Sequence, residues 1–129
     1  MYKPSGHNAV SPYLIVADAE AALHFVKSVF GVEPILLMRR EDGSVMHAEV
    51  KIDDSIVMIG QGDGPASHVH IYLDDVDAAM ERALAAGATL VQPADEKGDG
   101  DRRGGVRDPT GTHWWLGRMM DEGESRRRA

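Results

Sequence analysis

The sequence contains no cysteine among its 129 residues. This absence excludes disulfide bonds, thiolate nucleophiles and thiolate metal sites, and it leaves the redox compartment open. The chain also has no apolar run as long as a signal peptide or a membrane span, and its first residues, MYKPSGHNAV, are largely polar. We therefore expect a cytoplasmic protein with no membrane partner.

Positive charge is scarce as well. The chain has 14 Lys and Arg residues against 21 Asp and Glu residues, which gives a formal net charge of −7. Nucleic-acid binding requires a clustered basic face, so we expect no nucleic-acid partner. The run Arg126–Arg128 is the exception, and we interpret it as part of a solvated terminal tail.

The spacing of apolar residues predicts the same order of elements twice. One predicted helix follows the cap residue Asp18 and ends before Gly31, and a second follows Asp75 and ends before Gly87. Strands are predicted at 10–16, 34–39, 45–52, 55–60, 67–73, 89–92, 103–107 and 112–117. The repeat is visible in the residues themselves, since VADAEAA at 16–22 corresponds to LDDVDAA at 73–79.

This order defines an α+β fold of two βαβββ modules in a single domain, residues 1–129. We place module one at 10–60, a linker at 61–66, module two at 67–118 and a flexible tail at 119–129.

The segment 100–117, GDRRGGVRDPTGTHWWLG, is the most informative stretch. Pro109 fixes φ for a tight turn and Gly111 tolerates a positive φ, so a chain reversal is predicted over 108–111. The residues that follow are β-prone, and alternation along a strand sends Trp114 and Trp115 to opposite faces. We expect Trp114 in the core and Trp115 on the face that binds a ligand.

Alternation assigns the other strands in the same way. The residues predicted to face the core are Val10, Pro12, Leu14, Val16, Met46, Ala48, Val50, Ile52, Val69, Ile71 and Leu73. The candidate ligand-binding residues lie on the opposite faces: Tyr13, His47, Glu49, His68, His70, Tyr72 and Trp115. Aromatic side chains with a few polar groups are typical of small-molecule sites. Alternatively, each histidine is simply a polar residue on a half-solvated sheet.

With these features in place, the chain resembles the vicinal oxygen chelate superfamily, which includes glyoxalase I, bleomycin-resistance proteins and extradiol dioxygenases. The resemblance covers residues 10–118. The segments GDRRGGVRDPTGTHWW and MHAEVKIDDS look most like the PhnB-like branch. The resemblance implies curled mixed sheets that form a groove, commonly completed by dimerisation, so we expect a homodimer with a small-molecule ligand.

Metal-dependent members of that superfamily place one ligand on each of four strands. The resemblance puts these positions at Ser11, Glu49, His70 and Trp115, of which only Glu49 and His70 can ligate a metal ion. His47 or His68 is a possible replacement ligand, although side chains two residues apart on a strand start about 7 Å from each other.

Two hypotheses follow. The first is a binding protein for an aromatic or amphipathic compound, with no cofactor. The alternative is a lyase, isomerase or oxygenase that uses a divalent metal ion held by Glu49 and His70, with Glu49 as the catalytic group. Gly98–Gly105 is interpreted as a mobile lid or a dimer-contact loop. Its arginines and Arg107 are either solvated partners of nearby acids or an anion-recognising strand edge. His7 is assigned to a loose N-terminus.

Overall fold

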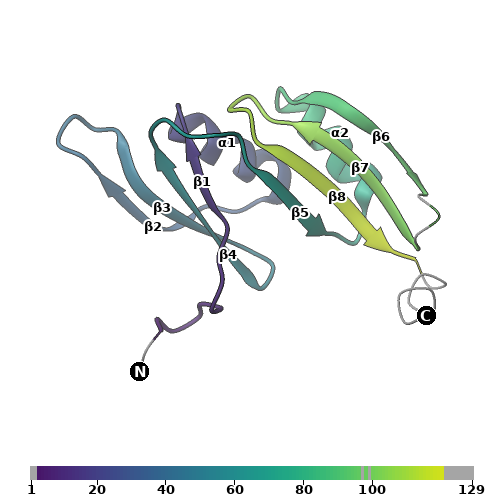
Figure 1. Ribbon diagram of the computed structural model, residues 1–129, viewed down its shortest axis with the longest axis horizontal. Helices are drawn as coiled ribbons and strands as arrows, with labels where there is room; N and C mark the ends of the chain where they lie inside the picture. The colour runs from purple at the N-terminus through teal and green to yellow at the C-terminus, as the bar shows by residue number, and fades with distance from the viewer. Residues whose placement is uncertain (1–2, 97, 99, 121–129) are drawn as a thin grey trace.

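The computed structural model describes residues 3–96, 98 and 100–120 (Figure 1). In chain order the elements are β1 (Tyr13–Val16), α1 (Ala19–Phe30), β2 (Pro34–Arg39), β3 (Val45–Ile52), β4 (Ser55–Gln61), β5 (His68–Tyr72), α2 (Val76–Ala85), β6 (Thr89–Glu96), β7 (Asp101–Arg107) and β8 (His113–Met119). The predicted α+β fold with two βαβββ units is confirmed. Within the described ranges, neither helix is long and apolar enough to cross a membrane.

Each unit forms its own four-stranded mixed sheet, and the two sheets have equivalent orders. The first is β1-β4-β3-β2 and the second is β5-β8-β7-β6. In each, the first strand of the unit pairs in parallel with the last, and the remaining pairs are antiparallel. The sheets lie side by side without closing into a barrel (Figure 1).

Both helices begin where the sequence predicts. The carboxylates of Asp18 and Asp75 each accept a hydrogen bond, at 3.1 Å, from the backbone N–H three residues later. Figure 1 shows α1 and α2 together on the far side of the two sheets. Each sheet therefore has one face covered by a helix and one open face.

The predicted faces are mostly confirmed, with three exceptions in module one. Val10 and Pro12 are exposed because β1 begins only at Tyr13, so the strand alternation does not extend to them. Met46 is 41% exposed, whereas Val45 is fully buried. The cause is a β-bulge: Met38 pairs with His47 and Arg39 pairs with Val45, which leaves Met46 as an extra residue.

The strand predicted over 103–107 is confirmed, and it begins two residues earlier, at Asp101. Residues 101–105 of the segment interpreted as a loop therefore belong to β7, which forms a long hairpin with β6. The strand propensity of this charged, glycine-rich segment is low, but its pairing with β6 and β8 overrides it. Arg102 ion-pairs with Asp77 of α2 at 2.8 Å. Residues 97 and 99, the run Arg126–Arg128 and the tail beyond Met120 lie outside the described residues.

Trp114 joins the two units. It is 1% exposed, and its ring lies 6.2 Å from that of Phe25 and 5.2 Å from that of Phe30, both in α1. Its indole Nε1 donates to Asp108 Oδ2 at 2.8 Å. The other oxygen, Asp108 Oδ1, accepts from Thr110 N, Thr110 Oγ1 and Thr112 N at 2.8, 2.7 and 3.1 Å. Gly111 closes the DPTG turn with a φ of 96°. The turn thus holds the core tryptophan in place.

We predict that Asp108→Ala lowers the free energy of unfolding by about 3 kcal/mol or more, because it leaves several buried donors without an acceptor. Urea denaturation followed by tryptophan fluorescence measures the change. Asp63→Ala, at an exposed loop position, is the matched control and should change stability by less than about 0.5 kcal/mol. A similarly small effect at Asp108 would contradict this account of the turn.

Candidate functional site

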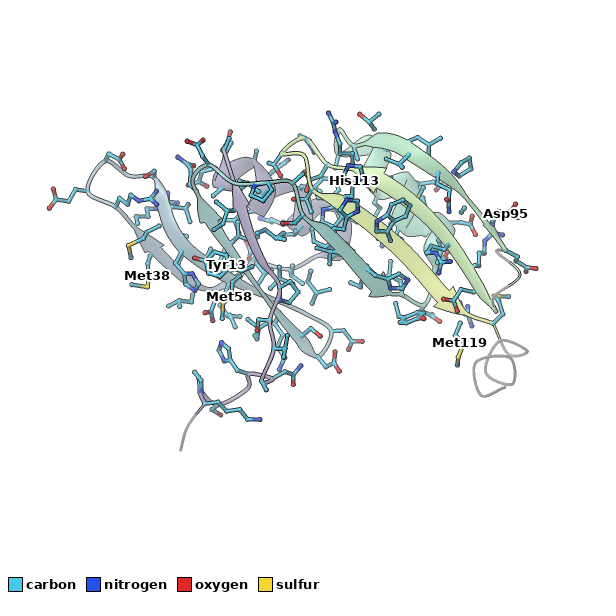
Figure 2. The ribbon with its side chains drawn as sticks, viewed as in Figure 1. Tyr13, Met38, Met58, Asp95, His113 and Met119 are labelled. Carbon is cyan, nitrogen blue, oxygen red and sulfur yellow. The ribbon has the colours of Figure 1, made fainter. Side chains whose placement is uncertain are left out.

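The strand registers define one equivalent row of residues across the open face of each sheet. In the first sheet the row is Tyr13, Met58, Glu49 and Leu36. In the second sheet the row is His70, Trp115, Gly105 and Gln92. Figure 2 shows Tyr13 and Met58 together on the first sheet. The repeat thus presents the same backbone positions twice with different side chains.

The two equivalent rows show which residues of one unit correspond to which residues of the other, and they correct two of the four metal-ligand positions expected from the sequence. The residue that corresponds to His70 is Tyr13 rather than Ser11, which precedes β1. The residue that corresponds to Trp115 is Met58 rather than Glu49, which lies on the neighbouring strand β3. Of the four related positions, only His70 carries a side chain that binds metal ions well.

Glu49 is the centre of a hydrogen-bonded chain on the first sheet. Its side chain is buried, and its two oxygens contact His7 Nε2 at 2.9 Å and His47 Nε2 at 2.8 Å. His47 Nδ1 lies 3.1 Å from the Tyr13 hydroxyl. We call His7, Glu49, His47 and Tyr13 the Glu49 network. It brings together three of the residues predicted for the site and adds His7.

The hydrogen bond with His47 keeps the pKa of Glu49 below its ordinary value of 4.5, and His7 adds to this effect while burial opposes it. The carboxylate is therefore ionised at neutral pH and has no proton to donate. An ionised carboxylate only accepts hydrogen bonds, so both imidazoles must donate to it through Nε2–H. In the Glu49 network, the two imidazoles are thus the donors and the carboxylate is the acceptor.

His7 was missed by sequence reasoning. It lies before the first strand and belongs to no periodic pattern, so nothing in the sequence indicates that the N-terminal segment folds back onto β3. The segment is also held by a hydrogen bond from Asn8 Nδ2 to the Asp54 carbonyl oxygen at 3.1 Å. The His7 side chain is only 15% exposed, and its buried Nδ1 has no hydrogen-bond partner among the residues that the structure describes.

The second sheet carries a stacked aromatic surface. The rings of His68 and Trp115 are nearly parallel, with an interplanar angle of 8° and centroids 6.2 Å apart, and Trp115 Nε1 donates to His68 Nδ1 at 3.1 Å. His113 also stacks on His68, with centroids 4.6 Å apart, and its ring lies 6.4 Å from that of Trp115. We call His68, Trp115 and His113 the aromatic platform. Alternation along the strand already places His113 on this face. Its contact with His68 is known only from the register of the parallel β5–β8 pair, in which the two residues are opposite each other.

Gly105 determines how Trp115 lies. A Cβ atom at this position would come within 2.5 Å of the indole ring, a distance that real Cβ atoms do not reach. The ring therefore rests directly on the backbone of β7, its cross-strand partner. Because only glycine leaves room for this arrangement, the face of Trp115 is held flat against the sheet.

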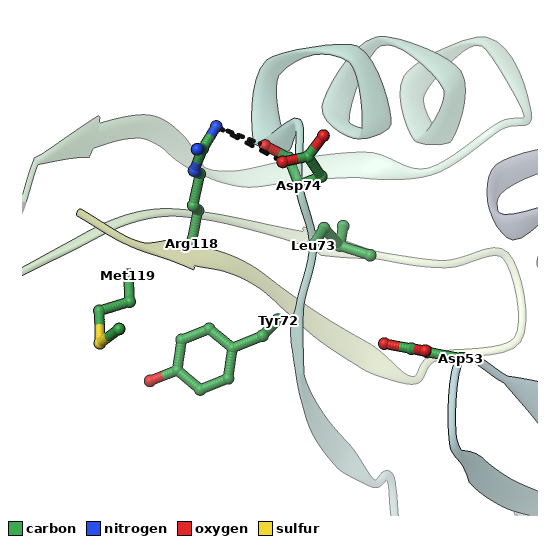
Figure 3. Close-up of a pocket in the computed structure, with 6 residues that line it drawn as sticks. All are labelled: Asp53, Tyr72, Leu73, Asp74, Arg118 and Met119. Carbon is green, nitrogen blue, oxygen red and sulfur yellow. Dashed lines mark hydrogen bonds and ion pairs between the residues drawn. The ribbon is translucent and has the colours of Figure 1, made fainter. Parts of the chain in front are cut away.

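Tyr72 borders two cavities, and His70 borders one of them. The larger, of about 620 Å³, is lined by Asp53, Tyr72, Leu73, Asp74, Arg118 and Met119 (Figure 3). In Figure 3, the Arg118 side chain points toward Asp74 and pairs with it, whereas the side chains of Tyr72 and Met119 point away from Asp74. The second, of about 430 Å³, shares Asp53 and Tyr72 and also contacts His70. The Tyr72 hydroxyl donates to the buried carboxylate of Asp101 at 3.0 Å.

The predicted site residues thus form two groups rather than one closed groove. Tyr13, His47 and Glu49 lie on the first sheet. The residues on the second sheet are His68, His70, Tyr72 and Trp115. Over the described part of the chain, no three His, Asp or Glu side chains are grouped so as to hold a metal ion. Glu49 and His70 are on different sheets, and Glu49 is already engaged by two imidazoles. The His, Asp and Glu side chains of residues 3–96, 98 and 100–120 therefore do not form a divalent metal site within one chain.

Comparison with known proteins matches residues 6–116 to the Glyoxalase/Bleomycin resistance protein/Dioxygenase superfamily. An uncharacterized protein from Mycobacterium bovis is 36% identical and matches 88% of this chain and 85% of its own length. The structure of TioX from Micromonospora sp. ML1 has a TM-score of 0.76 at 28% identity, covering 88% of this chain and 99% of that one. A variant of the Listeria monocytogenes fosfomycin resistance protein FosX, complexed with Mn(II) and a dihydroxypropylphosphonic acid, shares the fold, with a TM-score of 0.72 at 21% identity over the full length of both chains.

The lowered pKa of Glu49 predicts a specific acid sensitivity. The unfolded chain binds this proton at a higher pH than the folded chain does, so the stabilisation is present above pH 4.5 and is lost as the pH falls through the folded pKa. In Glu49→Gln, the free energy of unfolding should therefore decline less steeply between about pH 5 and pH 3. Urea titrations at each pH measure the slope. Glu33→Gln, at an exposed position paired with Lys27, should retain the wild-type slope, and an unchanged slope in Glu49→Gln would contradict the Glu49 network.

Proposed function

Because the chain belongs to the glyoxalase/bleomycin resistance protein/dioxygenase superfamily, we propose that it is a small-molecule-binding protein. Its ligand is a planar aromatic or amphipathic compound that stacks on the aromatic platform. One observation carries this proposal: the indole of Trp115 lies flat on Gly105 and parallel to His68, where a metal-dependent relative would need a ligating side chain. On the sequences of 46–55 and 100–115, we place it in the PhnB-like branch.

The chemistry of the platform favours a planar ligand. The polar atom of Trp115 is already satisfied by His68 Nδ1, so the ring presents only its π-face and needs no hydrogen bond from a ligand. Polar side chains at His70, Tyr72 and Arg103 lie at neighbouring register positions of the same sheet. An apolar stacking surface with a few polar groups beside it is the usual construction of a small-molecule site.

We further propose that two copies of the chain assemble to complete the groove, with the Glu49 network of one copy opposite the aromatic platform of the other. In one chain these two groups lie on separate sheets. The strand β2 also exposes consecutive apolar side chains, with Ile35 57% and Met38 43% exposed. An exposed apolar strip of this kind is typical of a protein interface.

Sedimentation equilibrium tests the assembly. We expect a mass close to twice the 14.0 kDa of one chain, because closed two-fold dimers are the commonest assembly of identical chains. Replacing Ile35 or Met38 by Asp should reduce this mass if β2 lies in the interface. A wild-type protein that stays monomeric at all concentrations would contradict the shared groove.

Truncation of the stacking residue tests the binding function. Trp115→Ala should weaken the affinity for a planar aromatic ligand found by thermal-shift screening by about 10-fold, which corresponds to roughly 1 to 1.5 kcal/mol of stacking. Leu84→Ala, which removes an exposed apolar side chain from α2, is the control and should leave the affinity unchanged. Titrations are run with EDTA. Binding that is seen only without EDTA and with an added divalent metal ion would favour the alternative, a metal-dependent enzyme. No stabilisation by any planar compound would contradict the proposal.

A further inference from the structure

We infer that the ligand carries an anionic group, such as a carboxylate, at the edge of its aromatic ring and that Arg107 binds this group. The inference rests on the proposed function, because it concerns the same ligand on the aromatic platform. It assigns Arg107 as a specificity-determining residue at one end of the platform and names the ligand class as a planar aromatic acid.

Arg107 lies directly beside the aromatic platform. In the β7–β8 pair it is opposite His113 (Figure 2), and His113 is opposite His68 in the neighbouring β5–β8 pair. Arg107 is also two residues along β7 from Gly105, on which the Trp115 ring rests. Side chains two residues apart on a strand share a face and start about 7 Å from each other, so the guanidinium can reach the edge of a compound stacked on the indole.

The three arginines of β7 differ in their partners. Arg102 ion-pairs with Asp77 of α2 at 2.8 Å, on the helix side of the sheet. Arg103 lies on the open face, where it contacts the buried carboxylate of Asp101 at 3.3 Å. Within the described residues, the exposed Arg107 side chain has no hydrogen-bond or ion-pair partner. Its positive charge is therefore available to a ligand.

The carboxylates around β7 do not neutralise this charge. Asp95 of β6 lies opposite Arg103, whereas Arg107 has Thr89 at the equivalent place. The Asp108 carboxylate, next in sequence, is buried, and its oxygens already accept hydrogen bonds from the turn and from the core tryptophan. The sheet thus offers a stacking surface with a positive charge at one end. A flat ring with a carboxylate at its edge matches both features, because a guanidinium can donate two parallel hydrogen bonds to a carboxylate.

Two matched probes test the inference: 2-naphthoate, which carries a carboxylate, and 2-naphthamide, which has the same rings and an uncharged amide. By isothermal titration calorimetry, the wild-type protein should bind 2-naphthoate about 3- to 10-fold more tightly, the range for a partly exposed charge-assisted contact. Arg107→Gln should reduce this ratio to below about twofold by weakening 2-naphthoate binding alone. Lys27→Gln, which removes the same charge from an exposed position on α1, should retain the wild-type ratio.

The salt dependence of binding separates the charge from the stacking. Potassium chloride screens an exposed charge pair, so raising its concentration from about 0.02 M to about 0.5 M should bring the wild-type ratio down toward one. In Arg107→Gln this salt-dependent loss of 2-naphthoate binding should disappear. Trp115→Ala should instead weaken both probes together and keep their ratio, because it removes the stacking surface and leaves the charge in place.

The outcomes distinguish this inference from the proposed function. If both probes bind the wild-type protein equally, or if the preference for 2-naphthoate survives in Arg107→Gln, the inference is overturned while the proposed function stands. The same conclusion follows if 2-naphthoate does not bind but another planar compound does. If neither probe binds, and no other planar compound does, the proposed function itself fails and the inference fails with it.

Discussion

The hydrogen bond between Trp114 and Asp108 is the interaction on which the rest of the molecule depends. Trp114 belongs to the second sheet, but its ring packs against Phe25 and Phe30 of the helix that covers the first. Asp108 fixes that ring while its other oxygen organises the turn before β8. A second link, from Arg82 Nε to the Val29 carbonyl oxygen at 2.8 Å, joins the two helices. These contacts orient both open faces, because both helices share one core on the opposite side.

The repeat supplies two similar backbones, and a few substitutions give them different chemistry. At the position where the first unit has Glu49, the second has Gly105, and where the first has Met58, the second has Trp115. A carboxylate at the centre of the row organises a polar network, whereas a glycine there leaves room for an indole ring. The two halves of the proposed groove are therefore complementary: one half supplies directional hydrogen bonds and the other supplies stacking area.

The sequence predicts most of the fold, since helix caps, turn residues and alternation are local signals. The order of elements along the chain, both helices and the opposite faces of Trp114 and Trp115 all follow from them. The bulge at Met46 and the extension of β6 and β7 depend on pairing between strands, which no local pattern records. For the candidate site, sequence identifies the residues on each open face but not their partners. His7 is found only in the structure because its contact with Glu49 spans 42 residues and involves a segment without periodicity.

For the ligand proposed above, the contact of Trp115 with Gly105 limits how binding specificity can change by mutation. Since the backbone of β7 sets the height of the indole ring above the sheet, a substitution elsewhere on the open face alters what surrounds a bound compound but not the plane in which it lies. Ligand size and polarity can thus vary in small steps through residues such as His70 and Gln92, while stacking depth stays constant. Among substitutions that keep Trp115, a change at position 105 would displace the ring, because a Cβ atom there would collide with it.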